Sequence, residues 1–160
     1  MKKELPGLTA TTRDMYIADQ KQFLQNVTNL VQRLRMRSPS LAWGLDLSVS
    51  SLKLLDEFIK SEIEKLIQQA LDVASHIDRD LVQEVVAYVG EVIRYSKDGW
   101  WQVKDNGQSG GPLVVFPLQV KSDNPNIRYK AIDIYERLLR IIIEGESINQ
   151  WYNLEIEIRD

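Results

Sequence analysis

The chain lacks cysteine and has a single histidine, His76, among its 160 residues. Without cysteine there are no disulfides, thiolate nucleophiles or cysteine metal ligands. One histidine argues against a Cys/His zinc site and against a Ser-His-Asp triad. We therefore predict a protein with no bound metal and no cofactor.

Long apolar runs are also missing. No stretch approaches the roughly 20 apolar residues that cross a bilayer. No apolar segment follows Lys2 and Lys3, as it would in a secretory signal. The sequence thus predicts a cytoplasmic protein that makes no contact with a membrane.

The net charge of −3 is unevenly spread, because residues 1–40 carry +4 and residues 41–160 carry −7. The basic segment could lie on its own acidic body, or it could bind a partner. Arg33, Arg35 and Arg37 have no aromatic residues between them, so we predict no binding to nucleic acid.

The remaining composition, 44% hydrophobic and 27% charged residues, is typical of a globular protein. We predict a single α+β domain over 1–160, in which 1–38 form a basic N-terminal helix extension. The expected order is α-β-α-α-β-β-α-β, with a small, mostly antiparallel sheet and long helices packed mainly on one face. Helices are expected at 12–37, 50–75, 81–97 and from Asn124 to Gly145, and strands at 41–48, 100–104, 113–120 and 152–160.

Two of the expected strands are predicted only from the alternation of apolar residues with small, polar or charged residues. Leu41, Trp43 and Leu45 alternate with small or polar residues near the N-terminus. Leu154 and Ile156 alternate with charged or polar residues near the C-terminus. A period of two is typical of a strand with one buried face.

Several helix ends are expected from capping residues. Asp80 is expected to begin the third helix, and Gly99 is expected to follow it in the left-handed conformation. Asn124-Pro125 favours the start of the last helix. Asp56 and Lys60 are expected to pair on the solvent side of the second helix.

The third helix has the clearest pattern. Val85, Val89 and Val92 lie on its broad apolar face, and we predict that they pack on the sheet. A glycine inside a helix, such as Gly90, lowers helix stability by about 1 kcal/mol relative to alanine. Gly90 therefore indicates either a close approach of another part of the chain to the helix backbone or a kink in the helix. A second stripe follows one edge of the apolar face and comprises Glu84, Tyr88, Glu91 and Tyr95.

This stripe and the nearby tryptophans supply the candidate binding residues. Adjacent residues of a strand point to opposite faces, so one tryptophan of the pair is expected in the core, and the other is expected either under a helix or exposed to solvent. We expect Glu91 to be buried and bonded to Arg94, to a backbone N–H or near Tyr88, in a structural role. The candidates for a ligand or partner site are Glu84, Tyr88, Glu91, Arg94, Trp100 and Trp101.

The glycines at 107, 110 and 111 do not indicate a phosphate loop. Such a loop leads directly into a helix, whose N–H groups point at the anion. Here a predicted strand follows, so we interpret the glycines as a hairpin connection.

The middle of the chain resembles a family of small uncharacterised bacterial domains. The matching positions are Asp46, Ser48, Ser51 and Leu52, then Tyr88, Gly90, Glu91, Ile93 and Arg94, and finally Gly99 and Trp101. They follow the patterns Asp-x-Ser-x-x-Ser-Leu, Tyr-x-Gly-Glu-x-Ile-Arg and Gly-x-Trp. The resemblance implies a fold and no activity.

Three functions stay open at this point. The first is a non-catalytic interaction or accessory protein of the bacterial cytoplasm, which binds a protein through its acidic surface or its basic N-terminal helix. The second is a small-ligand binding domain with a pocket near Tyr88, Glu91 and Trp101. The third is a carboxylate-dependent enzyme, which needs a second titrating group within reach of Glu91.

Overall fold

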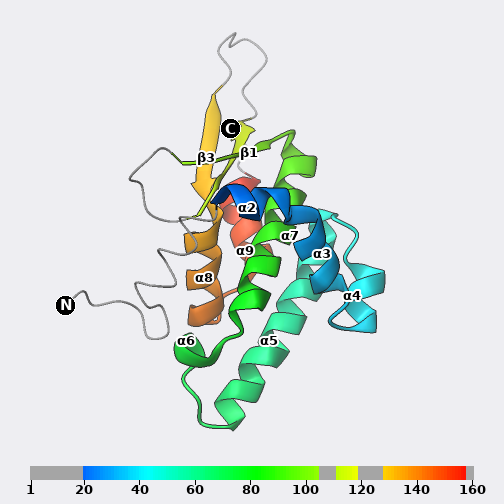
Figure 1. The fold of residues 1–160 in the computed structure, drawn as a ribbon, viewed down its shortest axis with the longest axis vertical. Helices are drawn as coiled ribbons and strands as arrows, with labels where there is room; N and C mark the ends of the chain where they lie inside the picture. Colours follow the sequence, from blue (N-terminus) through cyan, green and yellow to red (C-terminus); the bar gives the residue numbers. More distant parts are fainter. Residues whose placement is uncertain (1–19, 105–110, 119–127, 158–160) are drawn as a thin grey trace, which may run out of the picture.

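The computed structural model describes residues 20–104, 111–118 and 128–157, and their arrangement confirms the α+β class. In Figure 1 the sheet lies toward one end of the molecule, and helices make up the rest. The helices are α2 (Gln20–Gln25), α3 (Val27–Arg35), α4 (Pro39–Gly44), α5 (Leu52–Gln68), α6 (Val73–His76), α7 (Arg79–Lys97), α8 (Ile134–Glu144) and α9 (Ile148–Trp151). The strands are β1 (Trp100–Gln102), β2 (Leu113–Pro117) and β3 (Tyr129–Asp133), and two short helical turns are η1 (Val49–Ser51) and η2 (Tyr152–Ile156).

The sheet is antiparallel, with β2 between β1 and β3. Trp101 and Ile132 flank Val114 on the face that α7 covers. The opposite face carries Trp100 and Tyr129, which are both exposed. The strands expected at 100–104 and 113–120 are therefore observed as β1 and β2, although residues 119 and 120 lie outside the described part.

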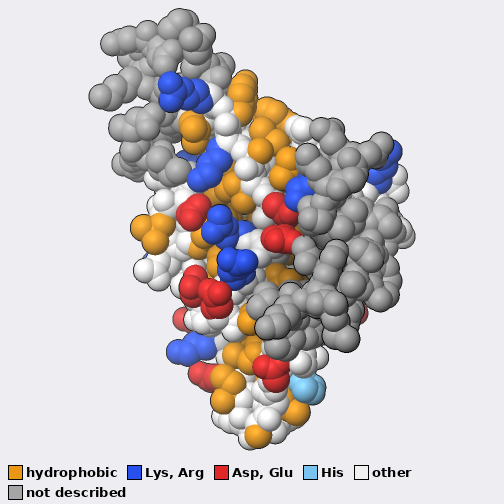
Figure 2. Space-filling view, turned by 90° about the vertical axis from the view of Figure 1, so that its left-hand side faces the viewer, with side chains coloured by type: hydrophobic (Ala, Val, Ile, Leu, Met, Phe, Trp, Pro, Cys, Tyr) orange, Lys and Arg blue, Asp and Glu red, His pale blue; other side chains and the backbone are white. Residues whose placement is uncertain are grey.

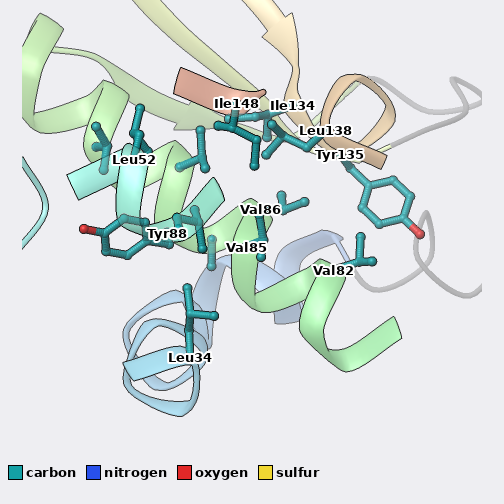
Figure 3. Close-up of a cluster of buried hydrophobic side chains, with 14 of the residues drawn as sticks. Leu34, Leu52, Val82, Val85, Val86, Tyr88, Ile134, Tyr135, Leu138 and Ile148 are labelled. Atoms are coloured by element: carbon teal, nitrogen blue, oxygen red, sulfur yellow. The ribbon is translucent and has the colours of Figure 1, made fainter. Parts of the chain in front are cut away.

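Helix α7 is the centre of the core. Val85, Val89 and Val92 are fully buried, as predicted, and α7 packs against β2. Figure 3 shows Leu34 of α3 and Leu138 of α8 on opposite sides of α7. Because fully burying one aliphatic side chain contributes about 1.5–3 kcal/mol, this helix carries a large share of the hydrophobic stabilisation.

The basic N-terminal region lies against this core where the structure describes it. The helix expected at 12–37 is observed from residue 20 as α2 and α3, which are separated at Asn26. The Asn26 side chain donates to the carbonyl of Gln22, a local bond that competes with helix continuation. Leu30 and Leu34 of α3 are buried, and α3 packs along α7.

The strand expected at 41–48 is wrong, because this segment forms α4 and a turn. Ser38 caps α4 by accepting the N–H of Leu41, and Pro39 occupies the first turn. Leu41 and Leu45 are buried whereas Trp43 is exposed. Leucines four residues apart fit one face of a helix as well as one face of a strand.

The C-terminal elements also differ from the expectation. Residues 129–133, expected within the last helix, form β3, and α8 begins after Asp133, which caps it by accepting the N–H of Glu136. Gly145 ends α8, as predicted, and takes the left-handed conformation there. The expected start at Asn124-Pro125 lies outside the described residues.

The strand expected at 152–160 is wrong for its described part, because residues 152–156 are helical. Tyr152 and Ile156 are buried four residues apart, and Leu154 is exposed. Residues 158–160 lie outside the described part.

The two expected ends of the third helix are both corrected. Asp78, not Asp80, caps α7 and accepts the N–H groups of Asp80 and Leu81. Asp98, not Gly99, takes the left-handed conformation after α7. A side chain at Gly99 would come too close to the Val115 carbonyl. The absence of a side chain at Gly99 therefore allows β2 to lie close to the backbone at this position.

The second expected helix, 50–75, is divided. Helix α5 ends at Gln68, and Asp72 caps the separate helix α6. Asp56 does not pair with Lys60: it accepts the Ser147 hydroxyl and the N–H groups of Ile148 and Asn149. This carboxylate therefore holds the start of α9 against α5.

Candidate functional site

Glu91 links α7 to the sheet. One carboxylate oxygen accepts the Trp101 indole N–H at 3.2 Å, and the other accepts Arg94 Nε at 2.9 Å. The Glu91 side chain is 12% exposed, which confirms that it is largely buried and bonded to Arg94. The bond to Glu91 raises the pKa of the Arg94 guanidinium above its usual range.

Gly90 makes this contact possible. A methyl group at Gly90 would overlap the six-membered ring of Trp101. The indole therefore lies directly on the α7 backbone. It also makes an edge-to-face contact with the Phe23 ring, with 5.7 Å between the ring centroids. The close approach expected at Gly90 is confirmed, and the side chain that approaches is Trp101.

Tyr88 lies inside the core. Its phenol oxygen lies 2.5 Å from the Ser51 hydroxyl and accepts the N–H of Leu47 at 2.9 Å. Burial raises the pKa of the Tyr88 phenol above its usual range, so the group stays neutral. Leu47 has a φ of 68°, a conformation that non-glycine residues rarely adopt, and the bond from its N–H supports it.

Glu84 forms a buried ion pair with the N-terminal region. The residue is 3% exposed. Arg37 donates to both of its oxygens, from Nε at 2.5 Å and from Nη2 at 3.0 Å. Arg37 Nη2 also pairs with Asp78 at 3.2 Å. The Arg37 guanidinium is thus used within the fold, where it joins the segment after α3 to α7.

Trp100 lies apart from the other candidates. Its ring meets the Tyr129 ring edge to face at 5.4 Å on the sheet face opposite α7. The structure therefore brings Glu91, Arg94 and Trp101 into one cluster. Glu84 and Tyr88 make separate contacts inside the fold.

A hollow of about 260 Å³ adjoins the Glu91 cluster. Its charged lining combines Arg35 and Arg94 with Asp46 and Glu91. Hydrogen bonds from the Ser48 hydroxyl and amide lower the pKa of the Asp46 carboxyl. Uncharged residues from α3, the 45–47 segment and α7 complete the walls: Thr28, Val31, Gln32, Leu45, Leu47 and Tyr95.

Arg35 has an unusual environment in this hollow. Its Nη2 donates to the carbonyl of Ala42 at 2.8 Å. Its Nε is buried, and no hydrogen-bond partner exists for it among the described atoms. Of the three residues at which a pocket was expected, Glu91 lines this hollow, whereas Tyr88 and Trp101 do not.

The strongest surface feature was not among the candidates. Trp43 of α4 is 89% exposed, and Met36, directly after α3, is 82% exposed. Assigning residues 41–48 to a strand placed Trp43 on the same face as Leu41 and Leu45. The i,i+4 spacing of those two leucines, after a Ser-Pro helix start, is the signal that would have placed Trp43 outside.

Two negative findings concern the part of the chain that the structure describes. It contains no group of three or more histidine, aspartate or glutamate residues that could hold a metal ion. None of its helices combines the length and the apolar character of a membrane-spanning segment.

Comparison of the chain with known proteins finds no matching family model, curated protein or solved structure. The resemblance to small bacterial domains therefore stays a prediction.

Proposed function

We propose that the chain is a non-catalytic accessory protein of the bacterial cytoplasm that binds a protein partner through the α3–α4 corner, residues 33–44. The observation that carries the proposal is the exposure of Trp43. Tryptophan is rarely left open to solvent, and it is enriched among the residues that dominate binding energy. Met36 adds a flexible apolar side chain that adapts to different partner surfaces.

The charges nearby favour the corner over the other proposed surfaces. Of the three arginines expected in the basic helix, Arg37 is bonded to Glu84 and Arg35 lines the hollow. Arg33 is exposed at the end of α3, where it adds positive charge beside the apolar corner. A partner with an apolar pocket and a negative rim would suit this arrangement.

The alternative version, an acidic surface, has no support on the face that Figure 2 shows. On the face shown in Figure 2, lysine and arginine side chains are interspersed with aspartate and glutamate side chains. Such a face presents no broad field of one sign that would steer a basic partner.

The test is affinity capture from one cell extract with the parent protein, Trp43→Ser and Leu154→Ser. Leu154 is a matched control because it is 71% exposed on η2, outside the corner. We expect a protein that the parent and Leu154→Ser retain equally and that Trp43→Ser loses, while thermal unfolding is the same for all three. Equal capture by Trp43→Ser and the parent would refute the role of the corner.

A second function, small-ligand binding, is favoured by the buried Arg35 Nε, which has no hydrogen-bond partner among the described residues. The hollow beside it carries charges of both signs, which would suit a small zwitterion such as an amino acid. We expect an amino acid panel to raise the melting temperature of the parent and of Arg33→Gln but not of Arg35→Gln. No shift with any member of the panel would argue against this function.

The third function, a carboxylate-dependent enzyme, has less support: Asp46 lines the same hollow as Glu91, but no hydrogen bond joins the two carboxylates in the described part of the chain. The described bonds of Glu91 go to Arg94 and to the Trp101 indole. Neither group releases or accepts a proton readily near neutral pH, so Glu91 has no acid–base partner among its bonded neighbours.

A further inference from the structure

An apolar groove lies on the side of α5 that faces the turn between α8 and α9. Its volume is about 290 Å³. Ile59, Ile63 and Ile67 of α5 form one wall, and Ile142 and Ile148 contribute to the other. The apolar stripe runs outward along α5, because Ile59 is buried whereas Ile67 is 61% exposed.

Two exposed side chains of opposite charge, Lys60 and Glu64, border the same groove. No described residue forms an ion pair with either of them. Asp56, the carboxylate one turn before Lys60, is used to hold the start of α9. Glu146, at the turn between α8 and α9, is a further exposed acidic residue of the lining. The groove thus combines exposed apolar surface with one positive charge, Lys60, and one negative charge on the same helix, Glu64, neither of which is paired with a described residue.

The charges and the isoleucines of α5 are complementary to those of a second copy whose α5 runs antiparallel to the first. Two α5 helices related by a two-fold axis near Glu62 and Ile63 place Lys60 of each opposite Glu64 of the other. Direct pairing of the two isoleucine stripes places the axis at Ile63, one residue or about 1.5 Å further along α5 than exact charge pairing at Glu62, so the apolar and charge registers differ by two residues, or about 3 Å. A two-fold interface requires such self-complementarity.

We propose that the groove is a homodimer interface in which the α5 helices of two copies pair antiparallel. Burial of Ile63 and Ile67 supplies the apolar part of the interaction, and the two Lys60–Glu64 pairs set direction and register. The interface is independent of the α3–α4 corner, so either proposal can fail without the other.

The charge pairs allow a decisive exchange experiment with the full chain. Sedimentation equilibrium should show a dimer for the parent, and Lys60→Glu and Glu64→Lys should each weaken self-association about tenfold or more. When the two variants are mixed, both pairs between the chains become Glu–Lys again, so a heterodimer should form. The variant carrying both substitutions should dimerise as the parent does.

The apolar part has its own matched pair of variants. Ile67→Ser should abolish the dimer, and Leu154→Ser, at an exposed site elsewhere, should not. Both sites are exposed, so thermal unfolding at concentrations where the parent is monomeric should remain that of the parent.

Three results would overturn the proposal. The first is a parent protein that stays monomeric at its highest soluble concentration. The second is a dimer that is indifferent to both charge reversals, and the third is a mixture of the two variants that fails to form the heterodimer.

Discussion

At the scale of single residues, the contact of Gly90, Glu91 and Trp101 shows how one backbone position controls a side-chain network. The indole lies on α7 because residue 90 has no side chain. In that position its N–H reaches the Glu91 carboxylate, which also binds Arg94. A glycine that weakens the helix locally therefore permits a bond between the helix and the sheet.

Gly90→Ala should destabilise the protein by about 1–2 kcal/mol. Overpacking costs about 1–3 kcal/mol, and better helix propensity offsets part of it. Urea unfolding measures the loss. In a Trp101→Leu background the same substitution should become neutral or stabilising, and a loss of equal size there would show that the indole is not the cause.

Glu91→Gln should cost about 1–3 kcal/mol, and Glu91→Ala should cost at least as much. The amide of glutamine can still accept the Trp101 N–H but loses the charge pair with Arg94, whereas alanine loses both. Urea unfolding of the two variants tests this order. If both were as stable as the parent, Glu91 would belong to a ligand site instead of a structural network.

At the scale of elements, the structure ties α3 to α7 by packing and by one ion pair. Leu30 and Leu34 supply the apolar contact, and Arg37 reaches Glu84 across 47 positions of sequence. Glu84 is the deeply buried partner of this ion pair: its side chain is 4% exposed, whereas that of Arg37 is 26% exposed.

Arg37→Ala should destabilise the protein by about 3 kcal/mol, because it leaves the buried Glu84 carboxylate without its charge partner. Arg33→Ala is the matched control, since Arg33 lies on the exposed side of the same segment; it should change stability by less than about 0.5 kcal/mol. Chemical unfolding of both variants is the measurement. Similar losses for the two arginines would contradict a specific role of the pair.

At the scale of the whole molecule, two buried phenols make stability depend on alkaline pH. Burial raises the pKa of Tyr88 and of Tyr152 above the ordinary value of 10.0. The hydroxyl of Tyr152 bonds to Ser96 at 2.6 Å, as that of Tyr88 bonds to Ser51. Both groups hold their protons more tightly in the folded state than in the unfolded state.

The free energy of unfolding should therefore fall as the pH rises above about 10, because the unfolded chain loses these protons first. Below that pH the two phenols contribute no pH dependence. Tyr88→Phe should reduce the alkaline slope, while Tyr95→Phe, at an exposed position, should leave it unchanged. Denaturant unfolding across the alkaline range measures both slopes, and equal slopes for the three proteins would exclude the buried phenol as the cause.

The sequence by itself determined the features that depend on local periodicity. The valines of α7 repeat with the helical period, and β1 and β2 coincide with apolar runs that follow helix and turn signals. The α+β class follows from these elements. Gly90 was predicted to permit a close approach or a kink, because a glycine inside a strong helix requires a tertiary reason, and the structure shows the close approach.

Only the tertiary structure decided the segments in which two periods fit equally well. Leu41 and Leu45, like Tyr152 and Ile156, are four residues apart, which satisfies both a helix face and alternate strand positions. Local sequence cannot choose between them, because the choice depends on which surface of the core receives these side chains. The same holds for the candidate site, since Arg37 meets Glu84 and Tyr88 meets Ser51 across long stretches of chain. The exposure of Trp43 followed from that choice, because Leu41 of α4 and Leu45 directly after it point into the core, so Trp43 between them points to solvent.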